Sequence, residues 1–234
     1  MISNHNEIET KLDATGVSVT KFAEWCQSQD PRDSREVMGP DYYYRMEDRV
    51  LRHRVQEKGK EASAGHHELT VKLRKSDRST RDRLEIDLPF NTFSVKVEDV
   101  SGFVEAIGYR KEFVLTKIAH IFEYQRVIVA IYDVHQNDDA RWYRFIEIEA
   151  RKGEDITPDH AKKLVGAWTQ KIAEQFGIEN RPMNDSLYEF FSGRKYLKTP
   201  QSYVDPFQSP AKNVDLFNDL KMKPKKKKKK ERSK

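Results

Sequence analysis

The stretch EIETK at residues 7–11 places a charged side chain at every second position. Successive side chains of a β-strand point to opposite faces, so Glu7, Glu9 and Lys11 would share one face of such a strand. The residues between them, Ile8 and Thr10, would lie on the other face. Two interpretations remain open at this point. The charged face is either the solvated side of a surface strand, or it points into the protein.

The same spacing of charges recurs in other segments that alternate between polar and apolar residues. The acidic pairs are Glu7/Glu9, Glu85/Asp87 and Glu147/Glu149, and the basic pairs are Arg52/Arg54 and Lys72/Arg74. The alternation predicts eight strands, over residues 2–12, 42–46, 49–56, 69–75, 81–88, 112–123, 126–134 and 142–150. It also favours antiparallel pairing and a closed or nearly closed sheet.

Helical periodicity and capping residues predict helices at 18–28, 97–108, 157–177 and 186–191. The polar segment 29–40 contains Pro31, Gly39 and Pro40, and we expect a loop there. The predicted fold class is α+β: an antiparallel eight-stranded β-barrel, or tunnel, with flanking helices. We expect one domain at 1–200 and a Pro-containing, Lys-rich, disordered tail at 201–234.

Composition narrows the class of protein. Hydrophobic residues make up 37% and charged residues 35%, but the 12 Phe, 10 Tyr and 3 Trp indicate a packed core. Ten Lys or Arg and one Glu lie in 221–234, so the net charge of +5 belongs to the tail. The single Cys26 excludes an internal disulfide, and no apolar run is long enough to cross a membrane. We expect a cytoplasmic protein, or a nuclear one in a eukaryotic host.

If the charged faces line one barrel, its interior holds carboxylates beside basic groups. Carboxylate oxygens bind hard cations such as Mg²⁺ or Mn²⁺, whereas Arg and Lys bind phosphoryl oxygens. The pattern therefore points to a metal-assisted triphosphate site. The residues alone leave the alternative open, in which these are solvated strand faces joined by salt bridges.

EIETK resembles the ExExK signature of the CYTH superfamily, the triphosphate tunnel metalloenzymes, which include thiamine and inorganic triphosphatases. Further segments resemble family motifs in the same order. They are LRHR (51–54), LTVK (69–72), RLEID (83–87), FVEAIGYR (103–110), IYDV (131–134), FIEIE (145–149) and SLYEFF (186–191). The resemblance covers about residues 1–195.

This resemblance implies a metal-dependent triphosphatase that releases the terminal phosphate of tripolyphosphate, thiamine triphosphate or a nucleoside triphosphate. The implied ligands of Mg²⁺ or Mn²⁺ are Glu7, Glu9, Asp133, Glu147 and Glu149. The implied triphosphate contacts are Lys11, Arg52, Arg54, Lys72, Arg83 and Lys117. The implied catalytic residues are Lys11, Glu85 and Asp133, with Asp133 either binding metal or positioning the attacking water.

One position departs from the family pattern. Ala119 stands where the family usually has Arg, two residues after Lys117, and His120 would point away from the tunnel. Arg126, Arg194 or Lys195 would have to compensate. Two alternative functions therefore stay open: an adenylate cyclase of the CYTH type, and a binding module that holds a nucleotide, a triphosphate or an RNA 5′ end without turnover.

Other features have simpler interpretations. Three interpretations of the Lys-rich tail stay open: binding of nucleic acid through counterion release, a nuclear address, and contact with an anionic membrane. His66 and His67 fit an exposed turn better than a metal site, and Cys26 fits the core. The aromatic run Tyr42–Tyr44 is more typical of barrel packing than of base stacking.

Overall fold

The computed structural model describes residues 3–47, 49–58, 66–73, 83–91, 96–137, 139, 141–150, 156–183 and 185–193. For residues 3–7, 57–58, 66, 72–73, 83–85, 91 and 193 it describes the backbone alone. The predicted tail at 201–234 and the two basic residues Arg194 and Lys195 lie outside the described residues. The prediction of a domain boundary near residue 200 therefore stays a prediction.

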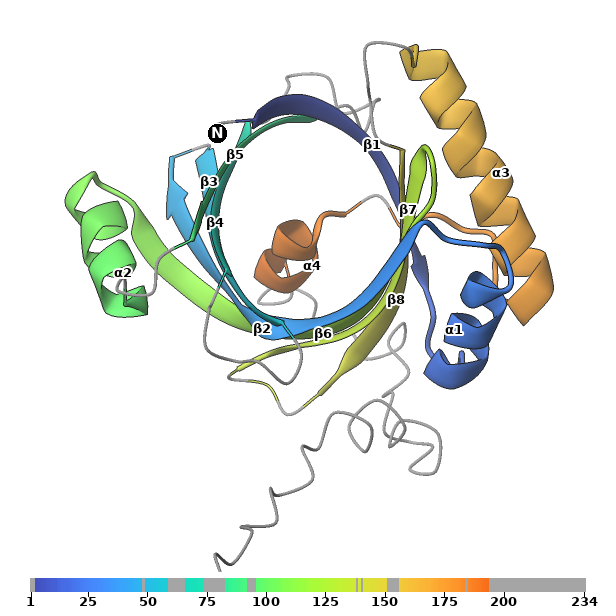
Figure 1. Ribbon diagram of the computed structural model, residues 1–234. Helices are drawn as coiled ribbons and strands as arrows, with labels where there is room; N and C mark the ends of the chain where they lie inside the picture. Colours follow the sequence, from blue (N-terminus) through green and yellow to red (C-terminus); the bar gives the residue numbers. More distant parts are fainter. Residues whose placement is uncertain are drawn as a thin grey trace, which may run out of the picture.

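Eight antiparallel strands form a closed barrel, as the alternation predicts (Figure 1). Their bounds are β1 Ser3–Asp13, β2 Asp33–Met46, β3 Arg49–Lys58, β4 His66–Leu73, β5 Arg83–Asn91, β6 Arg110–Glu123, β7 Val127–Gln136 and β8 Tyr143–Ala150. Around the barrel the order is β1-β5-β4-β3-β2-β6-β7-β8. Strand β1 closes the ring, because its first half pairs with β5 and its second half pairs with β8.

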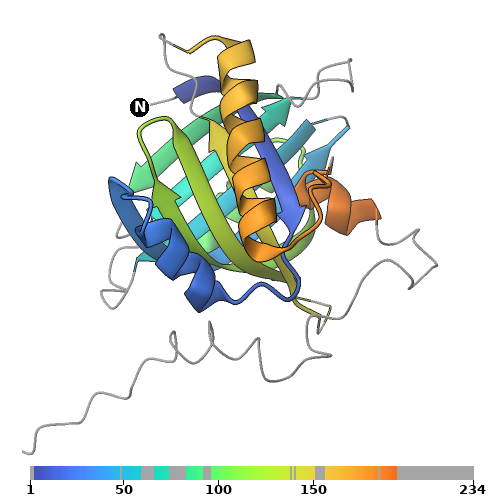
Figure 2. The ribbon, with the colours of Figure 1, turned by 90° about the vertical axis from the view of Figure 1, so that its right-hand side faces the viewer.

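Three helices cover the outside of the barrel. Helices α1 (Val19–Gln27) and α3 (Pro158–Phe176) lie on one side, and α2 (Val97–Ala106) lies on the opposite side (Figures 1 and 2). The predicted caps are confirmed: the hydroxyls of Ser18 and Thr157 accept hydrogen bonds from the first turns of α1 and α3. Gly177 ends α3 at a φ of 62°, a left-handed conformation that glycine adopts without strain.

Two apolar layers cover the outside of the barrel wall. Outward side chains of β1, β6, β7 and β8 pack with α1 and α3, and this outer layer includes Phe22 and the fully buried Cys26. A smaller outer layer on β2 and β3, around Tyr44 and Leu51, packs under α2. Cys26 is therefore a core residue, as predicted. Among the described helices, none is long and apolar enough to cross a membrane.

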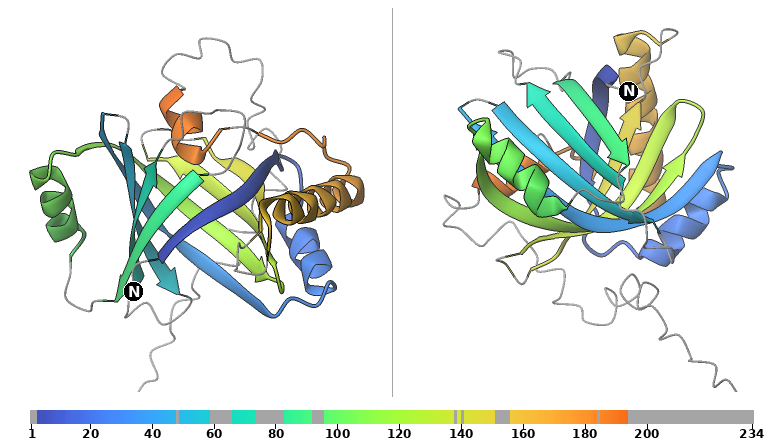
Figure 3. Two further views of the ribbon diagram at one scale, coloured as in Figure 1. Left: turned by 90° about the horizontal axis from the view of Figure 1, so that it is seen from above. Right: turned by 60° about the vertical axis from the view of Figure 1, so that its left-hand side comes forward.

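A short helix, α4 (Leu187–Gly193), lies over one mouth of the barrel (Figure 3, left). Its Leu187, Tyr188, Phe190 and Phe191 are buried against inward side chains that include Phe145. The helix begins at Ser186, whose backbone N–H and hydroxyl both donate to the carboxylate of Glu189. Helix α4 therefore forms an apolar floor at that end of the interior.

The predicted loop at 29–40 is wrong from residue 33 onward, because Asp33–Met46 form the strand β2. The strand pairs with β6 from Asp33 to Arg45, through partners such as Gly39↔Lys117 and Pro40↔Thr116, with one register shift between Tyr43 and Tyr44. On its other edge, pairing with β3 is interrupted at Gly39 and Pro40. A Cβ at Gly39 would lie 1.9 Å from the carbonyl oxygen of Val55, so only glycine fits this approach. Gly39 and Pro40 therefore mark a gap in the pairing with β3, and the strand continues through them because it pairs with β6.

Candidate functional site

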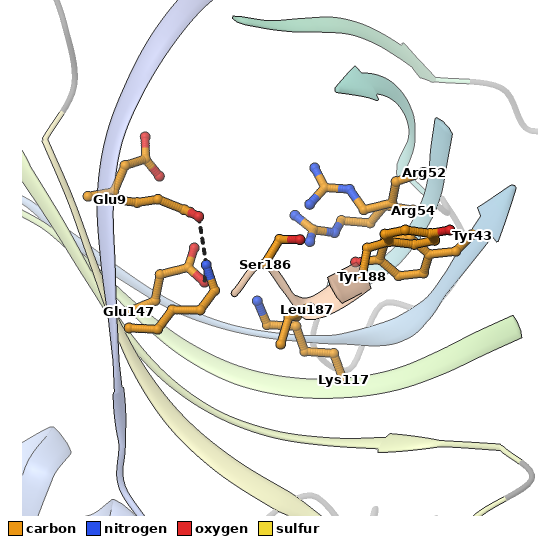
Figure 4. A pocket seen from close by; sticks show the side chains of 11 residues that line it. Glu9, Tyr43, Arg52, Arg54, Lys117, Glu147, Ser186, Leu187 and Tyr188 are labelled. Carbon is orange, nitrogen blue, oxygen red and sulfur yellow. Dashed lines mark hydrogen bonds and ion pairs between the residues drawn. The ribbon is translucent and has the colours of Figure 1, made fainter. Parts of the chain in front are cut away.

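Charged side chains from four strands surround a cavity of about 90 Å³ inside the barrel (Figure 4). Glu9 and Lys11 come from β1, Arg52 and Arg54 from β3, Lys117 from β6, and Glu147 and Glu149 from β8; Tyr43, Ser186, Leu187 and Tyr188 complete the lining. A space of this size holds several water molecules. The predicted interpretation of EIETK as an inward charged face is therefore confirmed for Glu9 and Lys11.

Carboxylates gather where β1 meets β8. Glu9 is the direct cross-strand partner of Glu149, and Lys11 is the partner of Glu147. Like charges placed directly opposite one another on neighbouring strands are destabilising unless a cation lies between them. The Lys11 ammonium supplies part of that charge, since its Nζ lies 2.7 Å from Glu9 Oε1 and 3.3 Å from Glu147 Oε2.

Lys11 stays protonated in this setting. Burial alone would lower its pKa, but the carboxylates of Glu147 and Glu9 outweigh burial and hold the pKa of Lys11 above its usual range. Its ammonium therefore belongs to the acidic side of the tunnel. Figure 4 shows Glu9 and Glu147 on one side of the cavity and Arg52 and Arg54 on the other.

The two arginines of β3 lie across the cavity from the glutamates (Figure 4). Each arginine also contacts an acid of its own. Arg54 donates through Nε and Nη2 to both oxygens of Asp41, at 2.8 and 3.0 Å. Arg52 donates to Glu68 at 3.1 Å and to the Thr70 hydroxyl at 2.9 Å. The arginines are thereby held by buried hydrogen bonds in fixed positions.

Lys117 connects the two sides of the tunnel. Its Nζ lies 3.7 Å from the centre of the Tyr132 ring, and the Tyr132 hydroxyl donates to Glu147 at 3.1 Å. Burial is the main cause that lowers the pKa of Lys117, to about 8; Arg54 and Arg52 also lower it, against Glu147 and Asp41. Within the part of the chain that the structure describes, no carboxylate lies within ion-pair distance of Lys117.

The prediction that Asp133 joins the metal ligands is wrong. Asp133 lies on the outer face of β7, where both its oxygens accept hydrogen bonds from Arg144 at 2.6 and 2.7 Å. Arg144 is 2% exposed and also donates to the carbonyl oxygen of Val17. The residue of β7 that reaches the tunnel is its neighbour Tyr132, because adjacent side chains of a strand point to opposite faces.

Four further predicted site residues have a described backbone and no described side chain. They are Glu7, Lys72, Arg83 and Glu85. The backbone register pairs Glu7 with Arg83 and Lys72 with Glu85, so all four lie on neighbouring strands of the wall. Their predicted roles stay predictions.

The departure at Ala119 has a clear structural counterpart. Ala119 is buried on the inner face with Lys117, where it packs near Val37 and Ala130. His120 points away from the tunnel, as predicted, and its Nδ1 lies 3.3 Å from Glu36 on the outer surface. Arg126, one of the predicted substitutes for the missing arginine, does not line the cavity.

The donors fit a hard divalent cation by their chemistry. Glu9, Glu147 and Glu149 bring three carboxylates and Lys11 one ammonium to a common face, so a cation would relieve their repulsion. As the side chains stand, no group of three or more Asp, Glu, His or Cys among the described residues has the spacing of a metal site. Lys11 occupies the space between Glu9 and Glu147, and it would have to withdraw for a metal to reach both.

Several solved structures have a similar fold. The PH1819 protein of Pyrococcus horikoshii OT3 matches with 20% identity and a TM-score of 0.58, over 80% of this chain and 99% of that one. A candidate adenylate cyclase of Vibrio parahaemolyticus matches with 16% identity and a TM-score of 0.55, over 81% and 99%. A second candidate adenylate cyclase, from Bacillus halodurans, matches with 18% identity and a TM-score of 0.50, over 80% and 98%.

The chain has the CYTH fold. The resemblance read from EIETK and the later motifs is thus confirmed at the level of fold. No protein-family model and no curated protein matches the sequence. Because a CYTH fold can serve several chemistries, activity has to be argued from the site itself.

Several residues of this CYTH tunnel were missed by the sequence analysis. They are Asp41, Tyr43, Glu68, Thr70, Tyr132, Ser186, Leu187 and Tyr188. Asp41 would have been found by extending the period-two pattern one step back from Tyr43, and Glu68 and Thr70 by extending that of Lys72 backward. Nothing local distinguishes Tyr132, since it differs from Asp133 only in which face it occupies.

Two minor predictions have mixed outcomes. His67 is buried in β4 on the outer wall, where its Nδ1 lies 2.9 Å from His53 Nε2, so the prediction of an exposed turn is wrong for His67. The prediction that Tyr42–Tyr44 serve barrel packing is confirmed. Tyr43 stacks on Phe113 inside, and Tyr44 packs under α2 outside.

Proposed function

We propose that the protein is a triphosphatase that depends on a divalent metal, Mg²⁺ or Mn²⁺, and releases the terminal phosphate of an organic or inorganic triphosphate. One observation carries the proposal. A carboxylate face on β1 and β8 lies across one cavity from arginines on β3 and Lys117 on β6. A polyphosphate chain with its cation needs both kinds of group at once.

Glu9, Glu147 and Glu149 would hold the metal, which when bound neutralises phosphate charge and activates water. Arg52, Arg54 and Lys117 would bind and orient the phosphate oxygens. Positioning and charge stabilisation supply most of the catalysis in phosphoryl transfer, so no nucleophilic side chain is required. Water would attack the terminal phosphorus, the bond to the bridging oxygen would break, and a diphosphate would leave with that oxygen. A tunnel carboxylate would accept the proton of the attacking water.

The direct test is phosphate release with Mg²⁺ or Mn²⁺ from tripolyphosphate, thiamine triphosphate, nucleoside triphosphates and RNA with a 5′-triphosphate. We expect release from at least one of them. A folded protein that releases phosphate from none of these substrates contradicts the proposal.

The variant Glu149→Gln sharpens this test. It should abolish phosphate release, because it removes a metal ligand. It should also raise the free energy of unfolding by up to about 1 kcal/mol, because Glu149 faces Glu9 directly across the strand pair. Loss of activity together with a loss of stability would indicate a structural role instead.

A second candidate function is an adenylate cyclase, which the two structural neighbours described as candidate cyclases favour. That enzyme would use the same charges but would let the ribose 3′-hydroxyl of ATP attack its α-phosphorus, with diphosphate as the leaving group. Chromatography of the products decides between the two. Cyclic AMP and diphosphate indicate a cyclase, whereas ADP and phosphate indicate a triphosphatase.

The third function left open by the sequence, a binding module without turnover, is motivated by Ala119. Ala119 removes one cation from the inner wall, so binding could persist while catalysis is lost. Tight binding of a triphosphate with no product after hours would favour it. The chromatography of products described above would detect this absence of turnover.

A further inference from the structure

We propose that Asp41 makes the tunnel selective for a triphosphate that enters with its divalent cation, and that Asp41 excludes the free anion. This inference rests on the proposed function. It concerns which form of the substrate binds, and it names a specificity-determining residue on β2 that lies outside the motifs of the sequence analysis.

The geometry of Asp41 removes the usual anion-binding edge of Arg54. The two residues are direct partners in the β2–β3 pairing, and Asp41 is 2% exposed. Two parallel hydrogen bonds, from Nε to Oδ1 and from Nη2 to Oδ2, occupy one whole side of the guanidinium. A guanidinium binds phosphate most strongly through such a paired contact. With that side engaged, Arg54 can offer a phosphate only its remaining N–H groups.

Asp41 also cancels charge that would attract an anion. Coulomb attraction falls only as the inverse of distance, so a carboxylate directly behind a guanidinium removes most of its pull on a phosphate in front. Burial alone would raise the pKa of Asp41, but Arg54 outweighs burial and the pKa falls to about 2. The carboxylate is therefore ionised at every pH at which the protein would be assayed.

Two other bases of the tunnel also contact carboxylates that offset their charge. Lys11 contacts Glu9 and Glu147, and Arg52 contacts Glu68. Among the side chains that the structure describes, four bases line the cavity; three of them contact a carboxylate, and Lys117 lies over an aromatic ring. A free triphosphate entering this space meets carboxylates on both sides. A triphosphate that carries a dication brings positive charge that offsets these carboxylates.

The test measures binding without turnover. The probe is a methylene-bridged tripolyphosphate, which cannot be hydrolysed, titrated calorimetrically into the full chain in EDTA and again in excess Mg²⁺. For the wild-type protein we expect binding in EDTA to be roughly 100-fold weaker than in Mg²⁺. For Asp41→Asn, which keeps a hydrogen-bond acceptor for Arg54, we expect affinity in EDTA to rise roughly 10-fold.

Asp33→Asn is the matched control. It makes the same change of charge on the same strand, at an exposed residue paired with Arg35, and should leave the ratio of the two affinities unchanged. Equal affinity of the wild-type protein in EDTA and in Mg²⁺ would overturn the inference, as would a folded Asp41→Asn variant with the wild-type ratio. The wild-type comparison decides alone if Asp41→Asn does not fold.

The outcomes separate this inference from the proposed function. If the wild-type protein binds the probe equally well in EDTA and still releases phosphate with Mg²⁺, the inference fails and the triphosphatase stands. If the probe binds in neither condition and no substrate is hydrolysed, the triphosphatase itself is wrong and the inference falls with it.

Discussion

Tyr132 and Asp133 are consecutive residues of β7, and their side chains lie on opposite faces of the barrel wall. The Tyr132 hydroxyl donates to Glu147 inside the tunnel, whereas Asp133 pairs with the buried Arg144 outside. The strand therefore contributes a hydroxyl and an aromatic ring to the tunnel at this position, and its carboxylate serves the outer wall. The two residues can be tested separately because their partners differ.

Tyr132→Phe should weaken metal binding while the fold persists. The variant keeps the ring beneath Lys117 and loses the hydrogen bond that orients Glu147. Loss of such an orienting contact typically costs about 10-fold or more in metal affinity. The measurement is Mn²⁺ binding followed by electron paramagnetic resonance. Tyr124→Phe, which loses a hydroxyl contact to Cys26 outside the tunnel, is the control and should bind Mn²⁺ as the wild type does.

Asp133→Asn should destabilise the protein without removing a tunnel residue. It leaves the guanidinium of Arg144 buried without its carboxylate, which typically costs about 3–5 kcal/mol. Urea unfolding at pH 7 measures this loss. The double variant Asp133→Leu/Arg144→Met should recover much of it, because neither charge then remains buried. If folded Asp133→Asn protein binds Mn²⁺ less tightly than the wild-type protein, Asp133 contributes to the metal site after all.

Phosphate affinity should fall as the pH rises through about 8, where Lys117 loses its charge. Burial depresses this pKa, so the ammonium form that attracts phosphate is complete only below that range. Lys117→Arg should bind with little change between pH 7 and 9, because arginine stays protonated. The measurement is KM for the best substrate across this range. An equally steep profile in Lys117→Arg would assign the titration to another group.

Acid should destabilise the protein through the buried His53 on the outer wall. Burial and, secondarily, His67 lower the pKa of His53 to about 4, below the value near 6.5 expected when unfolded. Between these two pKa values, His53 is protonated in the unfolded chain and neutral in the folded one. The free energy of unfolding therefore decreases as the pH falls from about 6.5 toward about 4. Between pH 7 and 5 the loss from His53 should be about 2 kcal/mol.

Urea unfolding at pH 7 and pH 5 checks this, with His53→Phe as the comparison. Phenylalanine fits the stacked position beside Tyr42 and Phe90 and cannot titrate. The variant should show a smaller decrease between the two pH values. An identical decrease in both proteins would mean that other groups cause the acid sensitivity.

Much of the barrel was predictable because its signals are local. Strict alternation in EIETK and FIEIE fixes which side chains share a face, and Ser18, Thr157 and Gly177 mark helix ends through hydrogen bonds within a few residues. The strand β2 was not predictable in the same way. Its first half contains Gly39 and Pro40 and becomes a strand because β6 pairs with every residue from Asp33 to Tyr43.

Residue order alone places charged side chains on shared strand faces and gives one chain both acidic and basic faces. Strand pairing in the folded barrel sets which charges meet, because pairing fixes the register between neighbouring strands. Pairing of consecutive strands gave Arg54 the carboxylate of Asp41 and turned Asp133 toward Arg144. Closure of the barrel by β1 and β8 placed Lys11 between Glu9 and Glu147. The sequence of one strand decides which of its side chains share a face. The residues that these side chains contact depend on the neighbouring strands of the folded barrel.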